Sequence, residues 1–230
     1  MSDRQNLDRI AQIETFARQH MEGGEVGHDF KHVDRVRHHA LYIAQHTSYD
    51  DLDRVQAAAL LHDVALKYVK KRSDHGEVGS QMTEKFLTEN QLFTSEEVAE
   101  IVHAIRWHDS VKRDPGRLLA ILRDADMLEI FGAVGLIRAF TSKAMLPEYD
   151  AAMLPAETWG LSAEGFTQRF ASGAGIGATI MDQVSFQISC FENLNTEIAR
   201  QIARPLVDYM RGFATQLVKE ITQHSELYVP

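Results

Sequence analysis

Apolar residues recur along most of the chain at three- and four-residue intervals, the spacing of one face of an α-helix. This pattern predicts helices over residues 5–21, 30–43, 57–63, 75–87, 95–108, 115–128 and 197–221. The alternation of apolar and polar positions that indicates a half-buried β-strand is not sustained in the sequence. We therefore predict an all-α protein, a bundle of about eight to ten helices.

Local signals set some of the boundaries. Thr94, followed three residues later by Glu97, has the Ser/Thr-x-x-Glu form of a capping box and opens the helix at 95. Pro115 stands where it can open the next helix, and Pro205 is expected to kink the last one. Residues 145–178 contain Pro and a Gly-rich run, and predict a partly irregular, mobile insertion.

The third predicted helix has an unusual pattern. Its stretch 57–63 consists of three alanines and two leucines followed by His62 and Asp63. A helix that is apolar nearly all round is buried, so both polar side chains are placed inside the protein or at the floor of a cleft. Such burial is unfavourable unless ion pairs, hydrogen bonds or a metal compensate for the lost water.

The composition bounds the domain organisation. A chain of 230 residues, 44% of them hydrophobic, is long enough for one sizeable core, and we expect a single domain over 1–230. The net charge of −9 argues against a general binder of nucleic acid or of anionic membranes. Cys190 has no second cysteine to pair with, and the sequence shows neither a secretion signal nor an apolar membrane span. These features predict a cytoplasmic protein.

Histidine is the chemical anomaly of the sequence, with 11 in the chain. Several of these imidazoles, and two carboxylates, lie where predicted helices begin or end, so that they can converge. These positions are His32, His62, Asp63, His75, His108 and Asp126. Imidazoles and carboxylates together suit a divalent transition metal, or two metals that share a carboxylate. Taken singly, such a histidine is more often a hydrogen-bonded core or surface residue than a ligand.

Four motifs, in this order, carry a resemblance. They are His-Asp-x-x-His-x-x-Arg-Val at 28–36, Ala-Leu-Leu-His-Asp-Val at 59–64, His-Gly-Glu-x-Gly at 75–79 and Arg-Asp-Ala-Asp-x-Leu-Glu at 123–129. Their order resembles the HD superfamily of metal-dependent phosphohydrolases, and more narrowly the small single-domain, uncharacterised bacterial HD hydrolases. Residues 131–135 and 194–199 are similar to the C-terminal half of that subgroup. The resemblance implies an HD-type helical bundle with a metal-binding core at 26–130 and a C-terminal helical part, with a lid, at 131–230.

The resemblance also implies a set of metal ligands. That set is His32, His62, Asp63 and Asp126. His75 and His108 match the order of the further histidines in members with two metals, where Asp63 would bridge the ions. His103 competes with His108 for this place, and either could instead bind a substrate phosphate. One or two divalent ions are therefore expected, and the sequence does not distinguish Mn, Fe, Mg, Ni, Co and Zn.

Cations close to these ligands are expected to hold phosphate oxygens and to stabilise the charge of the transition state. The substrate-binding candidates are Lys31, Arg35, Lys67, Arg106 and His28. Arg35 and Lys67 are each about one turn from a ligand, and they join Asp63 in the predicted catalytic group. We interpret the run 70–72 as a solvated helix end. Asp29 or Asp34 is expected to accept a hydrogen bond from a ligand histidine.

The expected reaction follows from these groups. A divalent metal lowers the pKa of bound water from near 16 to about 7 and screens the charge of a phosphate. We expect hydrolysis of a phosphoester bond in a small phosphorylated metabolite, a nucleotide before others, because the acidic net charge disfavours long nucleic acids. Two alternatives remain open: a di-iron oxygenase with the same ligands, and a non-catalytic nucleotide-binding or regulatory domain.

Overall fold

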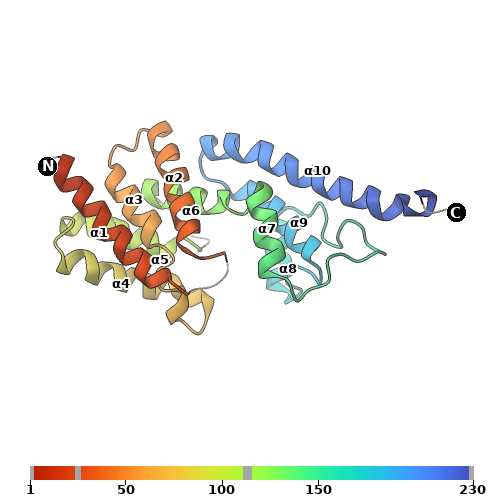
Figure 1. Cartoon of the computed structure of the whole chain (residues 1–230), viewed down its shortest axis with the longest axis horizontal. Coiled ribbons are helices and arrows are strands. Elements are labelled where there is room, and N and C mark those ends of the chain that lie inside the picture. The colour runs from red at the N-terminus through yellow and green to blue at the C-terminus, as the bar shows by residue number, and fades with distance from the viewer. Residues whose placement is uncertain (1–2, 24–26, 111–115, 228–230) are drawn as a thin grey trace. The chain divides into compact units, whose positions relative to one another are not determined.

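The structure is a computed structural model, and it describes residues 3–23, 27–110 and 116–227. In these residues the chain forms ten α-helices, three short 3-10 helices and no strand (Figure 1), which confirms the all-α prediction. No described helix is both long enough and apolar enough to span a bilayer. Two compact units divide the chain, Met1–Leu128 and Glu129–Pro230. Pro115, expected to open a helix, is outside the described residues.

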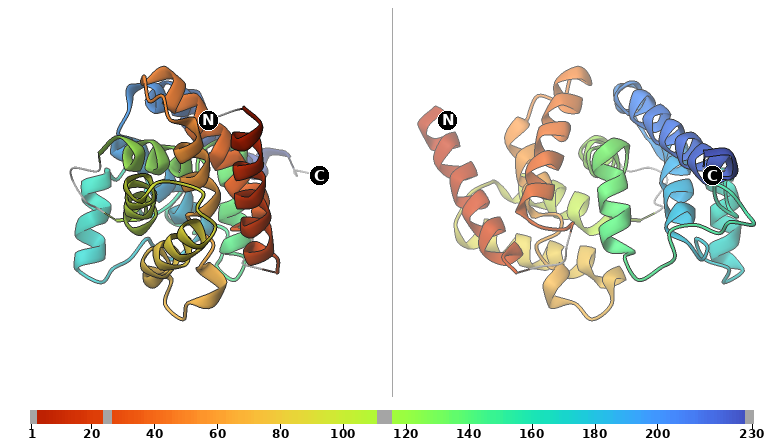
Figure 2. Two further views of the ribbon diagram at one scale, coloured as in Figure 1. Left: turned by 90° about the vertical axis from the view of Figure 1, so that its left-hand side faces the viewer. Right: turned by 45° about the vertical axis from the view of Figure 1, so that its right-hand side comes forward.

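The first unit contains six α-helices and two 3-10 helices. They are α1 (Asp3–Met21), α2 (Phe30–His46), α3 (Leu52–Leu61), η1 (Leu66–Tyr68), η2 (Arg72–Asp74), α4 (His75–Glu89), α5 (Ser95–Trp107) and α6 (Gly116–Leu128). Helix α3 contacts α1, α2, α5 and α6, and α4 packs along α5; these helices can be followed by colour in Figure 2. Helix α3 is therefore the central helix of this unit.

The sequence of α3 explains its central place. Asp51 caps its N-terminus, because the side chain accepts a hydrogen bond from the backbone N–H of Arg54 at 3.1 Å. Val55 and all residues from Ala57 to Leu61 are at most 1% exposed. The three small alanines allow neighbouring helices to approach closely. The burial predicted for this run is thus confirmed, and its last residues lead directly into His62 and Asp63.

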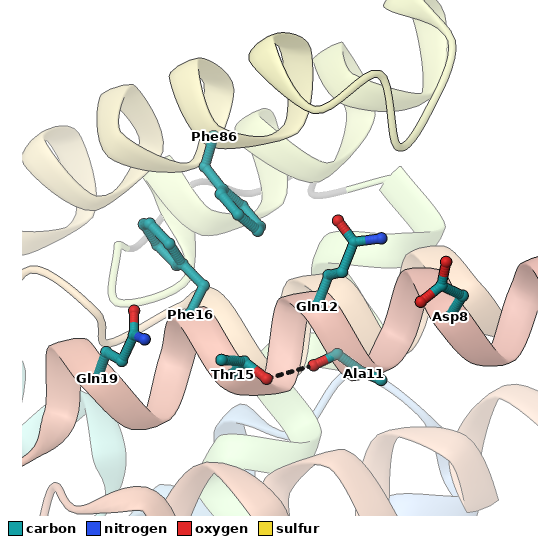
Figure 3. A pocket seen from close by; sticks show the side chains of 7 residues that line it. All are labelled: Asp8, Ala11, Gln12, Thr15, Phe16, Gln19 and Phe86. Atoms are coloured by element: carbon teal, nitrogen blue, oxygen red, sulfur yellow. Dashed lines mark hydrogen bonds between the residues drawn. The ribbon is translucent and has the colours of Figure 1, made fainter.

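A shallow groove lies between α1 and α4 (Figure 3). It has a volume of about 410 Å³, and the stacked rings of Phe16 and Phe86, with centroids 4.0 Å apart, join the two helices beside it. Asp8 is the one ionisable side chain among the residues that line the groove. The groove therefore offers no set of metal ligands.

The second unit contains α7 (Gly132–Ser142), α8 (Ala163–Ala171), α9 (Ile180–Ser189), η3 (Cys190–Asn193) and α10 (Glu197–Leu227). Helix α9 contacts α7, α8, η3 and α10. The segment 145–178, predicted to be partly irregular, contains one helix, α8, and its flanking residues 145–162 and 172–178 lie outside helices, mostly in turns and bends. Helix α10 continues through Pro205.

Asp182 holds the irregular segment against α9. Its Oδ1 accepts hydrogen bonds from the backbone N–H and the hydroxyl of Thr158, at 3.1 and 2.8 Å. Its Oδ2 accepts from the backbone N–H groups of Ala178 and Thr179 and from the Thr179 hydroxyl. Burial alone would raise the pKa of Asp182, but these hydrogen bonds outweigh it and keep the pKa below its usual range.

Candidate metal centre

The predicted metal ligands meet in the first unit, at the ends of five helices. His32 is in the first turn of α2, His62 caps the C-terminus of α3, His75 begins α4, His108 caps the C-terminus of α5, and Asp126 is in the last turn of α6. Asp63 follows His62 and is 4% exposed. Helix ends from separate parts of the sequence thus surround one buried carboxylate.

The two oxygens of Asp63 face different histidines. Oδ2 lies 3.5 Å from Nε2 of His32 and 3.5 Å from Nε2 of His62. Oδ1 lies 3.5 Å from Nε2 of His75 and 3.7 Å from Nε2 of His108. Asp63 therefore separates two groups of imidazoles and can contribute one oxygen to each.

Asp126 completes the group on the Oδ2 side. Its Oδ1 lies 3.2 Å from Nε2 of His32 and 3.8 Å from Nε2 of His62, and its side chain is 34% exposed. His32, His62 and Asp126 place their ligand atoms within 4.8 Å of one another, as do His62, Asp63 and His108. Asp126 is the more accessible of the two carboxylates, which gives this group an approach from solvent.

Backbone carbonyls fix which nitrogen of His62, His75 and His108 faces the centre. Nδ1 of His62 lies 2.8 Å from the carbonyl oxygen of Ala59, Nδ1 of His75 lies 2.5 Å from that of Arg72, and Nδ1 of His108 lies 2.6 Å from that of Ile105. A carbonyl oxygen can only accept, so Nδ1 carries the hydrogen and donates it.

In the neutral ring Nε2 then keeps its lone pair, and the distances to Asp63 show that Nε2 is the inward atom. The expected acceptors, Asp29 and Asp34, have other partners. Asp29 accepts from the backbone N–H of His32 at 3.2 Å as the N-cap of α2, and Asp34 pairs with Arg37.

The donor set fits a divalent transition metal. Nε2 of His62 is buried and has no hydrogen-bond partner among the described residues, which is unfavourable unless a cation occupies the space in front of it. Nε2 of His75 and Nε2 of His108 lie 3.0 Å apart. Two nitrogens bound to one ion at 2.0–2.1 Å, at tetrahedral or octahedral angles, are separated by about 3 Å.

The charges of the cluster act on each other. Burial is the largest influence on His62 and lowers its pKa to about 4, against the attraction of Asp63 and Asp126. Burial alone would raise the pKa of Asp63, but the surrounding histidines, His62 first among them, hold it well below its usual range. At neutral pH these residues thus provide a neutral imidazole and a carboxylate, the forms that bind metal.

The sequence leaves His103 and His108 as competing candidates on α5, and it gives Arg123 no role beyond its place in the motif 123–129. Of the two candidate histidines on α5, His108 is the one that the structure brings to Asp63. Arg123, on α6 with Asp126, donates to the carbonyl oxygen of Trp107 at 2.9 Å and to the Ser110 hydroxyl at 2.7 Å. It therefore fixes the turn that carries His108, a role that its spacing from Asp126 does not indicate.

Lys67 has partners away from this cluster. Its Nζ donates to the carbonyl oxygens of Gln19 and Glu22, at 3.3 and 3.2 Å. These oxygens are at the C-terminal end of α1, where a cation is favourable. The structure therefore places the ammonium of Lys67 at the end of α1.

The other predicted cations are distributed over the unit. Lys31 lies 3.2 Å from Oδ2 of Asp29, and Arg106 pairs with Glu77. Arg35 is half-buried on α2, one turn after His32.

Arg72 is the cation that sequence reasoning assigned to solvent and that the structure brings to the cluster. A hydrogen on Nη2 of its guanidinium is directed at Nε2 of His28, and the two nitrogens are 2.7 Å apart. Nδ1 of His28 in turn lies 2.9 Å from Oδ2 of Asp63. The sequence carries a signal only for the backbone contact of Arg72. This residue is three positions before His75, the spacing at which its carbonyl accepts the ring hydrogen of His75.

Comparisons with known proteins agree with this geometry. Residues 29–130 match the family model of the HD domain. The uncharacterized protein YpgQ of Bacillus subtilis (strain 168) is 28% identical over 231 residues, covering 94% of this chain and 95% of YpgQ. A structure of B. subtilis YpgQ in complex with ADP superposes with a TM-score of 0.64 at 24% identity, covering 95% of this chain and 97% of that one.

A predicted HD superfamily hydrolase from an uncultured Thermotogales bacterium has a TM-score of 0.61 at 25% identity and covers 91% of both chains. The match over 29–130 includes His32, His62, Asp63, His75, His108 and Asp126. The similarity to the HD-domain model therefore lies in residues 29–130, the part of the chain that carries the clustered imidazoles and carboxylates.

Proposed function

We propose that this protein is a metal-dependent phosphohydrolase that cleaves a phosphoester bond in a small phosphorylated metabolite, most simply a nucleotide. The observation that carries the proposal is the arrangement of imidazole Nε2 atoms around Asp63. Similarity to a predicted HD superfamily hydrolase and to YpgQ, which has been crystallised with ADP, supports the reaction class and the nucleotide.

In this proposal His32, His62, Asp126 and Oδ2 of Asp63 hold one divalent ion. His75, His108 and Oδ1 of Asp63 provide the ligands for a second ion, with Asp63 as the bridge. A bound ion would supply an activated water and would neutralise phosphate charge. The chain's own contribution is to exclude bulk water from Asp63 and to direct Nε2 of the histidines toward it.

Asp126 is partly exposed, so a substrate can approach the cluster from its side. Its side chain is 34% exposed, whereas those of His32 and His62 are fully buried. A substrate would therefore reach the cluster from the Asp126 side. Asp63, held by several histidines, keeps its position during the reaction.

The test combines metal analysis with variants of the cluster. We expect wild-type protein to retain a divalent metal and to hydrolyse an aryl phosphate and nucleotides. H62A and D63N should keep their helical circular dichroism while metal content and activity both fall to background. The matched control is H38A, since His38 is an exposed histidine of α2 whose Nδ1 bonds only to the carbonyl oxygen of Asp34.

Two results would contradict the proposal. If H62A and D63N both kept bound metal and full activity, the ligand assignment would be wrong. An iron-dependent visible absorption with oxygen consumption, and no phosphate release from any ester, would instead identify the di-iron oxygenase. Metal binding that stabilises the fold without any turnover would identify the regulatory domain.

A further inference from the structure

Arg72 contacts the candidate metal centre at two points. Its backbone carbonyl accepts the Nδ1 hydrogen of His75 at 2.5 Å, and its guanidinium donates to Nε2 of His28 at 2.7 Å. His75 belongs to the Oδ1 side of Asp63, and His28 contacts Oδ2. One residue of the short helix η2 is therefore joined to both sides of the same carboxylate.

The hydrogen bonds of His28 have only one consistent direction. A guanidinium has donors and no acceptor, so Arg72 donates and Nε2 of His28 accepts. Nδ1 of His28 must then carry the ring hydrogen and donate it to Asp63 at 2.9 Å. The lone pair of His28 faces Arg72, whereas those of His62, His75 and His108 face Asp63. His28 is therefore a connector between a cation and the centre, in contrast to the ligand histidines.

The position of Arg72 matters because the protein as a whole repels anions. The net charge is −9, and the cluster itself contains two carboxylates. A phosphate that approaches this site needs a local positive charge. Arg72 is exposed and permanently charged, and a single imidazole separates it from Asp63.

We propose that Arg72 binds a phosphoryl oxygen of the substrate, and that His28 holds its guanidinium beside the metal centre for this purpose. This assignment rests on the proposed function. The planar fork of a guanidinium matches two phosphate oxygens at once. His28 is then a positioning residue, since it contacts both Arg72 and Asp63.

The experiment measures inorganic phosphate binding to the metal-loaded protein by titration calorimetry, beside the metal affinity and the kinetics on an aryl phosphate. R72A is expected to weaken phosphate binding about tenfold to hundredfold, the usual effect of losing a hydrogen bond to a charged group. R72K should recover part of this affinity, because it restores the charge without the fork. The metal affinity of both variants should stay within twofold of wild type, because the His75 bond uses the backbone of Arg72.

The matched control is K71A, which removes the neighbouring exposed cation of the same segment. It should leave phosphate affinity within about twofold of wild type. H28N tests the positioning role: the phosphate affinity should fall toward that of R72A while the R72A/H28N double variant falls no further.

Three results would overturn the assignment. The first is a phosphate affinity of R72A equal to that of wild type. The second is a loss of phosphate affinity in K71A as large as that in R72A, which would show that only the general positive charge of the segment matters. The third is a tenfold loss of metal affinity in R72A, which would show that the guanidinium acts only through His28 on Asp63. If the wild type released no phosphate from any ester but bound phosphate through Arg72, the proposed hydrolysis would fail and the Arg72 site would stand.

Discussion

Gly76 and Gly79 provide a matched pair of positions next to the metal centre. Both lie on α4, one and four residues after His75; Gly76 faces the backbone of α5, and Gly79 faces atoms of Ala65, His62 and Ile105. A Cβ at Gly76 would lie 2.7 Å from the carbonyl oxygen of Arg106 and 3.4 Å from that of Ile105. A Cβ at Gly79 would lie 3.5 Å from Cβ of Ala65, an ordinary van der Waals contact. The same substitution therefore has opposite expected effects three residues apart.

The magnitudes follow from these distances. At Gly76 the nearest atom is a backbone oxygen of α5, which cannot rotate away, so G76A forces α4 and α5 apart. Overpacking of this kind costs about 1–3 kcal/mol. At Gly79 there is no such conflict, and alanine is favoured over glycine in a helix by about 0.5–1 kcal/mol. We expect G76A to lower and G79A to raise the free energy of unfolding of the first unit.

The assay uses the intrinsic fluorescence of the first unit. The chain has two tryptophans, Trp107 in the first unit and Trp159 in the second. In a W159F background, urea unfolding followed by Trp107 reports on the α4–α5 region alone. Gly76 follows His75, and the carbonyl of Arg106 that its Cβ would contact lies two residues before His108. G76A should therefore also weaken metal binding on the His75 and His108 side, while G79A leaves it unchanged. Equal unfolding free energies for the two variants would refute this account of the packing.

Three further predictions concern other buried groups. R123M should lower the unfolding free energy of the first unit by about 1.5–3 kcal/mol and weaken metal binding; R117M, an exposed control on α6, should leave metal affinity unchanged. Burial raises the pKa of the Cys190 thiol to about 12, so a disulfide reagent at pH 8 should react only after denaturation, and rapid labelling of native protein would contradict this. Asp182 has a folded-state pKa below its unfolded value, so its contribution to stability is present above that unfolded value and is lost as the pH falls. Acid should therefore weaken the Trp159-monitored transition of wild type more than that of D182N, and equal acid sensitivity would contradict the role of Asp182.

The places of the clustered histidines on their helices could be predicted from the sequence because the relevant signals are local. The apolar run 57–61 predicts a buried helix, and a buried helix places His62 at its end. Helix periodicity likewise locates His75 at the start of α4 and His108 at the end of α5. The sequence did not predict which oxygen of Asp63 faces which imidazole, because that depends on how five helix ends are oriented in space.

Lys67 and Arg72 show where reasoning from sequence distance stops. Lys67 is four residues after Asp63, which would place the two on one face of a continuous helix. However, α3 ends at Leu61, and Lys67 lies in the short helix η1, whose course takes its ammonium to the carbonyl oxygens of α1. The face-sharing argument therefore does not apply once the helix has ended. Arg72 is more distant in the sequence, yet the turn at η2 brings it to His28.

The ends of the helices also determine the chemistry of the histidines. A histidine at the end of a helix can donate Nδ1–H to the carbonyl three residues earlier, as His62 does to Ala59 and His108 does to Ile105. That bond satisfies one nitrogen locally and directs the lone pair of the other nitrogen away from the helix. Several such helix ends around one buried aspartate bring these lone pairs together, with backbone carbonyls orienting the rings of His62 and His108. In the sequence, a histidine directly after a buried apolar helix therefore predicts a ring of this orientation. His62, followed by Asp63, is the clearest instance in this chain.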